Sequence, residues 1–332
     1  MIGTKTGEVY TSTGYLHYHS PVITKKITDR HDELFESIQY IDDACQLNEI
    51  KDKALTEKLH NERAKLLRKG LGIVAFNMLE DFIRKRTHEV LINVSQSGIP
   101  FDYLSKNLQE ASTLGLLRSL SMRAKVEKNN NGNWVGLIRD EAYKIYSTGG
   151  VPYELSKYSL GWSNSNVSSD NVKEILSAMN IKNGWGILKT VSDAIGGGLT
   201  SPLDSYKNAA SRRHSSAHSP SFNYEYTFLN EIAHEIKSIA AAFDILLTAK
   251  YRQINKSPAK RIDQHNQQMP INFRYLEFTS QTYRESTVIG GRARKIWHSL
   301  SDAKGVLQQN NENKDEFIII LDSAKRITDW CI

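Results

Sequence analysis

The longest helical pattern in the chain contains no proline and runs from about Asp52 to Val94, so the fold must be built around one long helix. Apolar residues recur on it at three- and four-residue steps, the spacing of one helix face: Leu67, Leu71, Val74, Met78 and Phe82. Gly70 and Gly72 interrupt this pattern, and we expect a bend or a tight packing contact there.

A second strong amphipathic pattern follows Pro220. Its apolar positions are Phe228 or Leu229, Ile232, Ile236, Ile239, Phe243 and Leu247. Because each helix has one apolar face to bury, we expect the two stripes to pack against each other.

The chain divides into three predicted parts. Residues 1–27 lack a helical period and predict an extended arm or edge strand. Residues 28–250 predict a helical domain, and its less regular insert, at about 101–200, contains an Asn-rich turn at 129–133. Within the insert only 171–180 and 186–194 have the pattern of short helices.

The composition changes beyond Pro258, where residues 258–332 predict a small α+β domain. Strands are expected at 271–278 and 316–321, with a last strand ending near Trp330 and a helix from Arg292 to Gln309. The predicted fold class is therefore mainly α, a helical bundle with a variable insert and a small C-terminal α+β domain.

Composition narrows the functional classes. Hydrophobic residues make up 39% of the 332 residues and no apolar run approaches twenty residues, so we expect no membrane span. The first residues lack the apolar segment of a secretory signal, which predicts a cytoplasmic protein. Cys45 and Cys331 lie at opposite ends of the chain and form no metal-binding pattern, so we expect neither a metal nor a cofactor. A net charge of +6 mildly favours a polyanionic partner.

The most informative stretch for function lies between Asp204 and Pro220. Ser201 can cap a helix, Pro202 suits its first position, and Asp204 is favoured in its first turn. The helix then brings four charged or titratable side chains to its C-terminal end: Arg212, Arg213, His214 and His218.

These residue types suit the metal-independent cleavage of RNA. A histidine can accept or donate a proton near neutral pH, and an arginine can stabilise the charge that builds up on a phosphate. On a regular helix His214 and His218 face the same way, whereas Arg213 and His218 diverge by about 140°. A shared site then needs either a distorted last turn or a second copy of the helix. The alternative, to which we give even weight, is that these side chains only complement the helix dipole.

Other candidates are less distinctive. Glu80 could orient an arginine or histidine across the core, although a surface carboxylate is the simpler expectation. The cations at 84–86 are expected to complement a helix C-terminus in preference to binding nucleic acid. The glycines at 196–198 lack a following Gly-Lys-Ser/Thr and favour a flexible hinge over a phosphate loop.

Arg213-His-Ser-Ser-Ala-His218 resembles the R-(N/D/H)-x-x-x-H signature of the HEPN superfamily. Its setting is similar too: a long helix that contains residues 69–83, a variable insert, the motif helix and a closing helix. The segment from 171 to the motif resembles the RiboL-PSP-HEPN branch. The glycine usual after the motif is replaced here by Ser219-Pro220.

The resemblance implies an endoribonuclease that forms a homodimer with a composite active site. It implies that Arg213 and His218 are the catalytic pair, that His214 is a polar helper and that Arg212 contacts phosphate. We expect cleavage of single-stranded RNA through 2′-hydroxyl attack, in a toxin or antiphage defence effector with an antitoxin or defence-system partner. The alternative is a non-catalytic HEPN module that binds RNA or a protein partner.

The C-terminal region offers one further candidate for RNA binding. Arg292, Arg294 and Lys295 lie at the start of the helix expected there, where cations oppose the helix dipole. A role in RNA binding is therefore favoured over a purely structural role.

Overall fold

The computed structural model describes residues 24–162, 166–266, 268–311 and 315–332, and for residues 24–29 and 311 it describes the backbone alone. The predicted arm at 1–27 therefore lies almost wholly outside the described residues. The first helix begins at Thr24, inside the predicted arm. No helix of the described residues is long and apolar enough to cross a membrane.

The elements alternate little between helix and strand: helices fill the first three quarters of the chain and strands gather at its end. The helices are α1 (Thr24–Ala44), α2 (Lys58–Gln96), α3 (Lys106–Glu110), α4 (Leu116–Asn129), α5 (Trp134–Ser147), α6 (Ser169–Ala178), α7 (Gly184–Ala194), α8 (Pro202–His218), α9 (Tyr226–Asn255) and α10 (Leu300–Asn311). The strands are β1 (Asn272–Thr279), β2 (Thr282–Ser286), β3 (Lys295–Trp297), β4 (Glu316–Leu321) and β5 (Ile327–Cys331).

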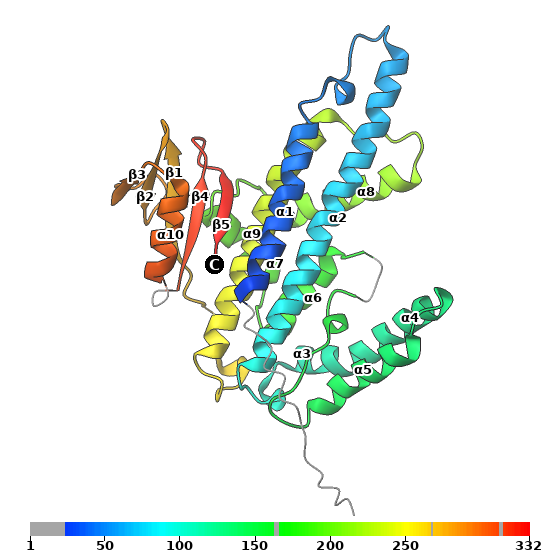
Figure 1. The fold of residues 1–332 in the computed structure, drawn as a ribbon, viewed down its shortest axis with the longest axis vertical. Helices are drawn as coiled ribbons and strands as arrows, with labels where there is room; N and C mark the ends of the chain where they lie inside the picture. Colours follow the sequence, from blue (N-terminus) through cyan, green and yellow to red (C-terminus); the bar gives the residue numbers. More distant parts are fainter. Residues whose placement is uncertain (1–23, 163–165, 267, 312–314) are drawn as a thin grey trace, which may run out of the picture.

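Three long helices, α1, α2 and α9, form the centre of the molecule, and α6, α7 and α8 pack around them (Figure 1). The predicted stripe of α9 is confirmed from Leu229 to Leu247, since all of those residues are buried. Every residue of α9 from Ser238 to Lys250 is buried, so this segment is covered on all sides. α9 is therefore the core helix of the fold.

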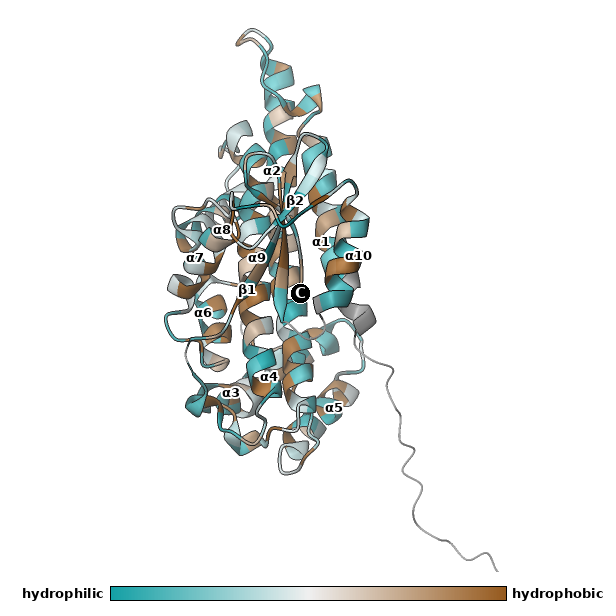
Figure 2. Ribbon diagram, turned by 90° about the vertical axis from the view of Figure 1, so that its left-hand side faces the viewer, coloured by the Kyte–Doolittle hydropathy of each residue, from teal (hydrophilic) through white to brown (hydrophobic). Residues whose placement is uncertain are grey.

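The strands form one mixed sheet in the order β3-β2-β1-β4-β5, with β1 parallel to β4 and the other pairs antiparallel. Alternate residues of β4 face opposite sides: Phe317 and Ile319 join the core of the helices, while Ile318 and Ile320 pack with Ala303 of α10. The sheet is thus a layer between the helical body and α10, and Figure 2 looks onto this side of the molecule.

A buried carboxylate ties the sheet to the helices. Asp244 of α9 pairs with Arg86 Nε of α2 at 2.5 Å and with Arg30 Nη1 of α1 at 3.6 Å, and Trp330 Nε1 of β5 donates to it at 2.9 Å. Burial acts to raise the pKa of Asp244, but the two guanidinium groups and the Trp330 hydrogen bond outweigh it and hold that pKa below its usual value.

The predicted stripe of α2 is partly wrong. Phe82 is buried as expected, but Leu67 and Val74 are 46% and 51% exposed, and the buried face is displaced toward Phe76 and Leu79. Gly72 does mark a tight packing contact, because a Cβ there would lie 2.3 Å from the ring of Tyr224. The periodicity predicts the helix correctly. It does not predict which of the two apolar faces of the helix the bundle buries.

The run Arg84-Lys85-Arg86 was also misinterpreted. α2 continues to Gln96, so these cations lie inside the helix and do not complement its C-terminus. Arg86 is buried against Asp244, Lys85 pairs with Asp81 and Glu33, and Arg84 turns toward the loop that carries Gly161.

The insert is more helical than expected. α4 and α5 form a hairpin that projects from the body (Figure 1), and the predicted Asn-rich turn joins them. Asn131 has a positive φ of 58° there, and the Asn133 side chain caps α5 by accepting from Gly136 N. Apolar residues of α4 such as Leu117, Met122 and Val126 stay exposed, so the hairpin buries only part of its apolar surface.

The helix predicted from Arg292 to Gln309 begins only at Leu300, after Ser299 Oγ accepts from Asp302 N. Arg292, Arg294 and Lys295 therefore do not start a helix. Arg294 N donates to Glu285 O and Lys295 opens β3, which pairs with β2. Pairing with a neighbouring strand overrides the local helical preference of this segment.

The glycines at 196–198 are a packing contact and not a simple hinge. Gly196 has a φ of 73°, and a Cβ there would lie 2.3 Å from the carbonyl oxygen of Lys325 in the β4–β5 turn. The Gly196 carbonyl accepts from Ile327 N, and the Gly197 carbonyl accepts from Ser238 Oγ. A side chain at Gly196 would push the sheet away from the helices.

Removing the buried carboxylate should destabilise the protein strongly. We expect Asp244→Ala to lower the free energy of unfolding by about 3 kcal/mol, because two buried arginines lose the Asp244 carboxylate and keep only that of Glu89. The matched control is Asp42→Ala, whose partly exposed pair with Lys237 at 3.7 Å should contribute below about 1 kcal/mol. Denaturant unfolding at neutral pH measures both.

The pH dependence gives a second check. Because the folded pKa of Asp244 is depressed, its stabilisation is complete above the unfolded pKa of about 3.9 and is lost as pH falls through the lower folded pKa. The difference in the free energy of unfolding between wild type and Asp244→Ala should therefore become smaller only at acid pH. A constant difference down to acid pH, or equal stability of the two proteins, would contradict this assignment.

Candidate active site

The motif helix α8 begins as the sequence predicts. Ser201 Oγ accepts from Asp204 N and Pro202 occupies the first helical position. Its N-terminal half is buried through Tyr206 and Ala209, and Tyr206 Oη donates to the carbonyl oxygen of Val167 at 2.7 Å. The buried half anchors α8 to the bundle, and the motif lies on the half that reaches solvent.

Arg213 turns toward α2. Its Nε donates to Asn77 Oδ1 at 3.3 Å, and its charge acts on the nearby carboxylate of Glu80. Glu80 is buried, contrary to the expectation of a surface carboxylate, and its Oε1 accepts from Val167 N at 2.5 Å. Burial raises the pKa of Glu80, while the Val167 hydrogen bond and the charges of Arg84 and Arg213 oppose that rise.

The two histidines of the motif face solvent together. His214 and His218 are both exposed, with ring centroids 4.6 Å apart and planes inclined by 48°. α8 remains a regular α-helix to His218, and only Ser219 becomes extended. The last turn is therefore not distorted, and on regular helical geometry Arg213 and His218 still diverge by about 140°.

The segment that replaces the usual glycine is held by α2. Lys69 Nζ donates to the carbonyl oxygens of Ser219 at 3.0 Å and of Pro220 at 2.7 Å. This contact fixes where the chain leaves the motif. Sequence analysis did not identify Lys69 or Asn77 as site residues. The nearest signal is the three-residue step from Asn77 to Glu80, which places two polar side chains on neighbouring positions of one helix face.

Arg212 points the opposite way from its neighbour. Its Nη2 pairs with Glu235 Oε2 of α9 at 2.8 Å, and its guanidinium lies 4.9 Å from the ring centre of Phe228. The side chains of Arg212 and Glu235 are only 14% and 17% exposed. Within the chain Arg212 connects α8 to α9, which is a structural role different from the predicted phosphate contact.

A basic and aromatic cluster lies beyond Glu80. Trp162 has the guanidinium of Arg84 4.6 Å from its ring centre and that of Arg123 at 4.7 Å. Arg84 Nε also donates to the carbonyl oxygen of Gly161 at 3.2 Å. These contacts join α2 to α4 and place two further cations near the Arg213 side of α8.

The C-terminal cations are not part of this site. Figure 1 places the β2–β3 side of the sheet across the molecule from α8. Arg292 and Arg294 line an open depression there, and Lys295 Nζ lies over the ring of Trp297. Any contact of these three residues with RNA belongs to a separate surface.

Within the described ranges, no group of three or more His, Cys, Asp or Glu side chains could hold a metal ion. The chemistry that the motif itself offers is proton transfer by imidazole and charge stabilisation by guanidinium.

The sequence model of the RiboL-PSP-HEPN family matches residues 29–249, from α1 into α9. No curated protein and no solved structure matches the chain. HEPN domains are generally associated with nuclease and RNA-binding functions. The match covers the helical body, which contains the motif helix, and leaves the C-terminal sheet outside. Because it spans more than half of the chain, the protein belongs to the RiboL-PSP-HEPN family.

Proposed function

We propose that this protein is a homodimeric, metal-independent endoribonuclease that cleaves single-stranded RNA. The 2′-hydroxyl oxygen forms a bond to the adjacent phosphorus, the bond from phosphorus to the 5′-oxygen breaks, and the products are a 2′,3′-cyclic phosphate and a 5′-hydroxyl. The observation that carries the proposal is the C-terminal end of α8, where His214 and His218 face solvent and Arg213 reaches toward Asn77 of α2.

Each side chain has a chemical role in this reaction. Asn77 engages Arg213 Nε, so that the terminal amino groups of the guanidinium can face the phosphate and stabilise its developing charge. Neutral His218 accepts the 2′-hydroxyl proton, and a protonated imidazole donates to the leaving 5′-oxygen. His214, packed beside His218, supports its orientation.

The regular geometry of α8 favours a site completed by a second copy. One protomer does not present Arg213 and His218 on the same face of the helix. A two-fold axis at this end of α8 would bring Arg213 of one copy to His218 of the other and would supply one imidazole as base and one as acid.

An exposed apolar stripe on α2 supports this arrangement. Leu59, Leu66 and Val74 are 67%, 70% and 51% exposed and lie on one face of the helix. Gly70 lies on the same face with open space around it, which would allow a second helix to approach closely. The same face continues to Asn77, the partner of Arg213, and apolar residues are visible at this protruding end in Figure 2.

Loss of the proposed base should abolish cleavage. We expect His218→Ala to reduce the rate of cutting of an end-labelled single-stranded RNA by about 10²- to 10⁴-fold in the presence of EDTA, because proton transfer at the 2′-hydroxyl is lost. Mass analysis of the wild-type products should find the 2′,3′-cyclic phosphate.

The matched control is Lys207→Ala, an exposed substitution on the same helix that should leave the rate unchanged. Equal cleavage by His218→Ala, or a requirement for a divalent metal, would refute the mechanism. Retention of RNA with no cleavage by wild type would instead indicate the non-catalytic binding module. For a toxin or defence effector, expression should arrest growth, and His218→Ala should relieve the arrest.

The composite site makes a separate prediction. Leu66→Asp combined with Val74→Asp should leave the fold intact, since both side chains are exposed, but should yield a monomer in light scattering because two carboxylates cannot be buried unpaired at the interface. The rate of RNA cleavage should fall to the same extent as the fraction of dimer.

Mixing inactive variants tests whether the site is shared. Co-expressed Arg213→Ala and His218→Ala chains should regain part of the activity, because a mixed dimer retains one arginine and one histidine at the shared site. Each variant alone is the control. An active monomer, or no recovery in verified mixed dimers, would argue against a site completed in trans.

A further inference from the structure

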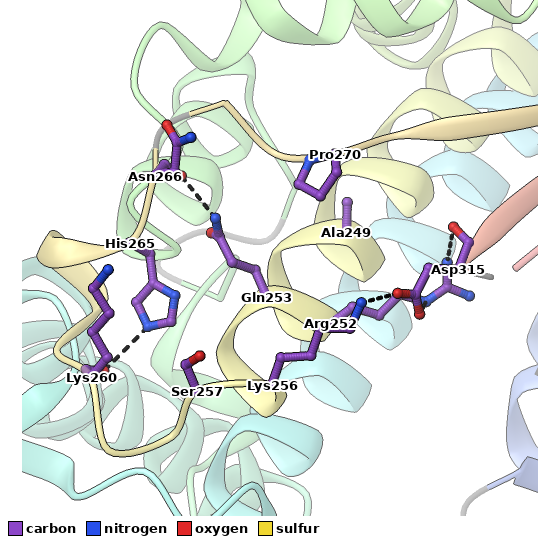
Figure 3. A pocket seen from close by; sticks show the side chains of 10 residues that line it. All are labelled: Ala249, Arg252, Gln253, Lys256, Ser257, Lys260, His265, Asn266, Pro270 and Asp315. Atoms are coloured by element: carbon purple, nitrogen blue, oxygen red, sulfur yellow. Dashed lines mark hydrogen bonds and ion pairs between the residues drawn. The ribbon is translucent and has the colours of Figure 1, made fainter. Parts of the chain in front are cut away.

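A pocket of about 290 Å³ lies between the C-terminal end of α9 and Asp315, the residue before β4 (Figure 3). Its walls come from the last turn of α9, from the connection that follows, and from Asp315 at the sheet side. The pocket lies far along α9 from Glu235 and the motif helix, at the lower end of α9 in Figure 1. Its volume is near the lower end for ligand sites, which suits a molecule of mononucleotide size.

Cations dominate the lining. Arg252, Lys256 and Lys260 surround the pocket together with His265, and Asp315 is the one carboxylate among the residues that line it. Asp315 pairs with Lys256 Nζ and, through its carbonyl oxygen, accepts from Arg252 Nη1 at 3.1 Å. The lining therefore keeps an excess of positive charge.

Part of this charge follows from the helix dipole, but not all of it. Arg252 and Lys256 lie at the C-terminus of α9, where cations are favoured. Lys260 and His265 belong to the following connection and face the pocket from its other side, where His265 Nε2 donates to the Lys260 carbonyl oxygen at 3.2 Å. The dipole gives no reason for the Lys260 cation on that second wall. Burial lowers the pKa of His265, so the imidazole contributes a polar group and not a charge.

A buried lysine behind the lining adds to this excess of positive charge. Lys250 is 1% exposed, and within the described part of the chain no carboxylate pairs with it. Its Nζ donates to Gln253 Oε1 at 2.9 Å, and Gln253 Nε2 donates to the carbonyl oxygen of Asn266 at the pocket rim. Burial lowers the pKa of Lys250 to about 8. An anion in the pocket would supply the negative charge that the surrounding protein lacks.

We propose that this pocket binds a small phosphate-bearing anion of mononucleotide size. Lys256, Lys260 and Arg252 would hold the phosphate through charge-assisted hydrogen bonds. Ala249 and Pro270 form an apolar part of the wall that suits the organic portion of the ligand. The lining includes both α9 and Asp315, so the ligand would contact the helical body and the residue that precedes β4.

Calorimetric titration of the full chain tests this site. Adenosine 5′-monophosphate is the first probe and inorganic phosphate the second. We expect saturable binding of the nucleotide that weakens at least about tenfold, or about 1.4 kcal/mol, in Lys256→Ala/Lys260→Ala. Lys173→Ala, an exposed lysine of α6, is the matched control and should bind as wild type does.

The two probes separate the sources of affinity. Equal affinity for the nucleotide and for inorganic phosphate would mean that the phosphate group accounts for binding. Tighter binding of the nucleotide would mean that the apolar wall also contributes. Either result supports the site. Arg213→Ala should bind the nucleotide normally, which separates this pocket from the proposed RNA site. Absence of binding at millimolar concentrations, wild-type affinity in the double variant, or loss of binding only in Arg213→Ala would overturn the proposal.

Discussion

The carboxylate of Asp244 is the interaction on which the arrangement of the molecule depends. It lies in the part of α9 that is buried on every side, where an unpaired charge would be prohibitively costly. Arg30 of α1, Arg86 of α2 and Trp330 of β5 all converge on it. Three elements distant in sequence thus acquire fixed positions around one helix, and the sheet is tied to the bundle through the same group.

That frame determines how the motif helix is presented. α8 packs between the two helices that Asp244 and Arg86 hold together, and its adjacent arginines separate: Arg212 pairs with Glu235 of α9 and Arg213 with Asn77 of α2. One arginine is therefore used to fasten α8, and the other remains at the solvent edge beside the exposed histidines. A regular helix ending at His218 supports a site formed by two copies over one formed by distortion within a single chain.

Much of the fold follows from local patterns. The long helices, the cap of α8 at Ser201, and strands β1 and β4 were predicted because their periodicity and capping chemistry are carried by neighbours in sequence. The hairpin of α4 and α5 was not predicted, although both helices have an amphipathic pattern. Strands β2 and β3 were not predicted either, because the pairing of β3 with β2 overrides a local preference for helix. The buried face of α2 was misplaced because two apolar faces compete and only the packing partner selects one.

By itself, the sequence determined the helical class, the family and the residue types at the end of α8, because these depend on spacing along the chain and on short motifs. Tertiary structure alone decided the direction of each motif side chain, the burial of Glu80, the use of Lys69 to hold Ser219-Pro220, and the cationic pocket at the end of α9. The physical reason is that charge pairing and burial are set by residues that lie from about sixty to more than a hundred positions apart, and no local pattern encodes which of them will meet.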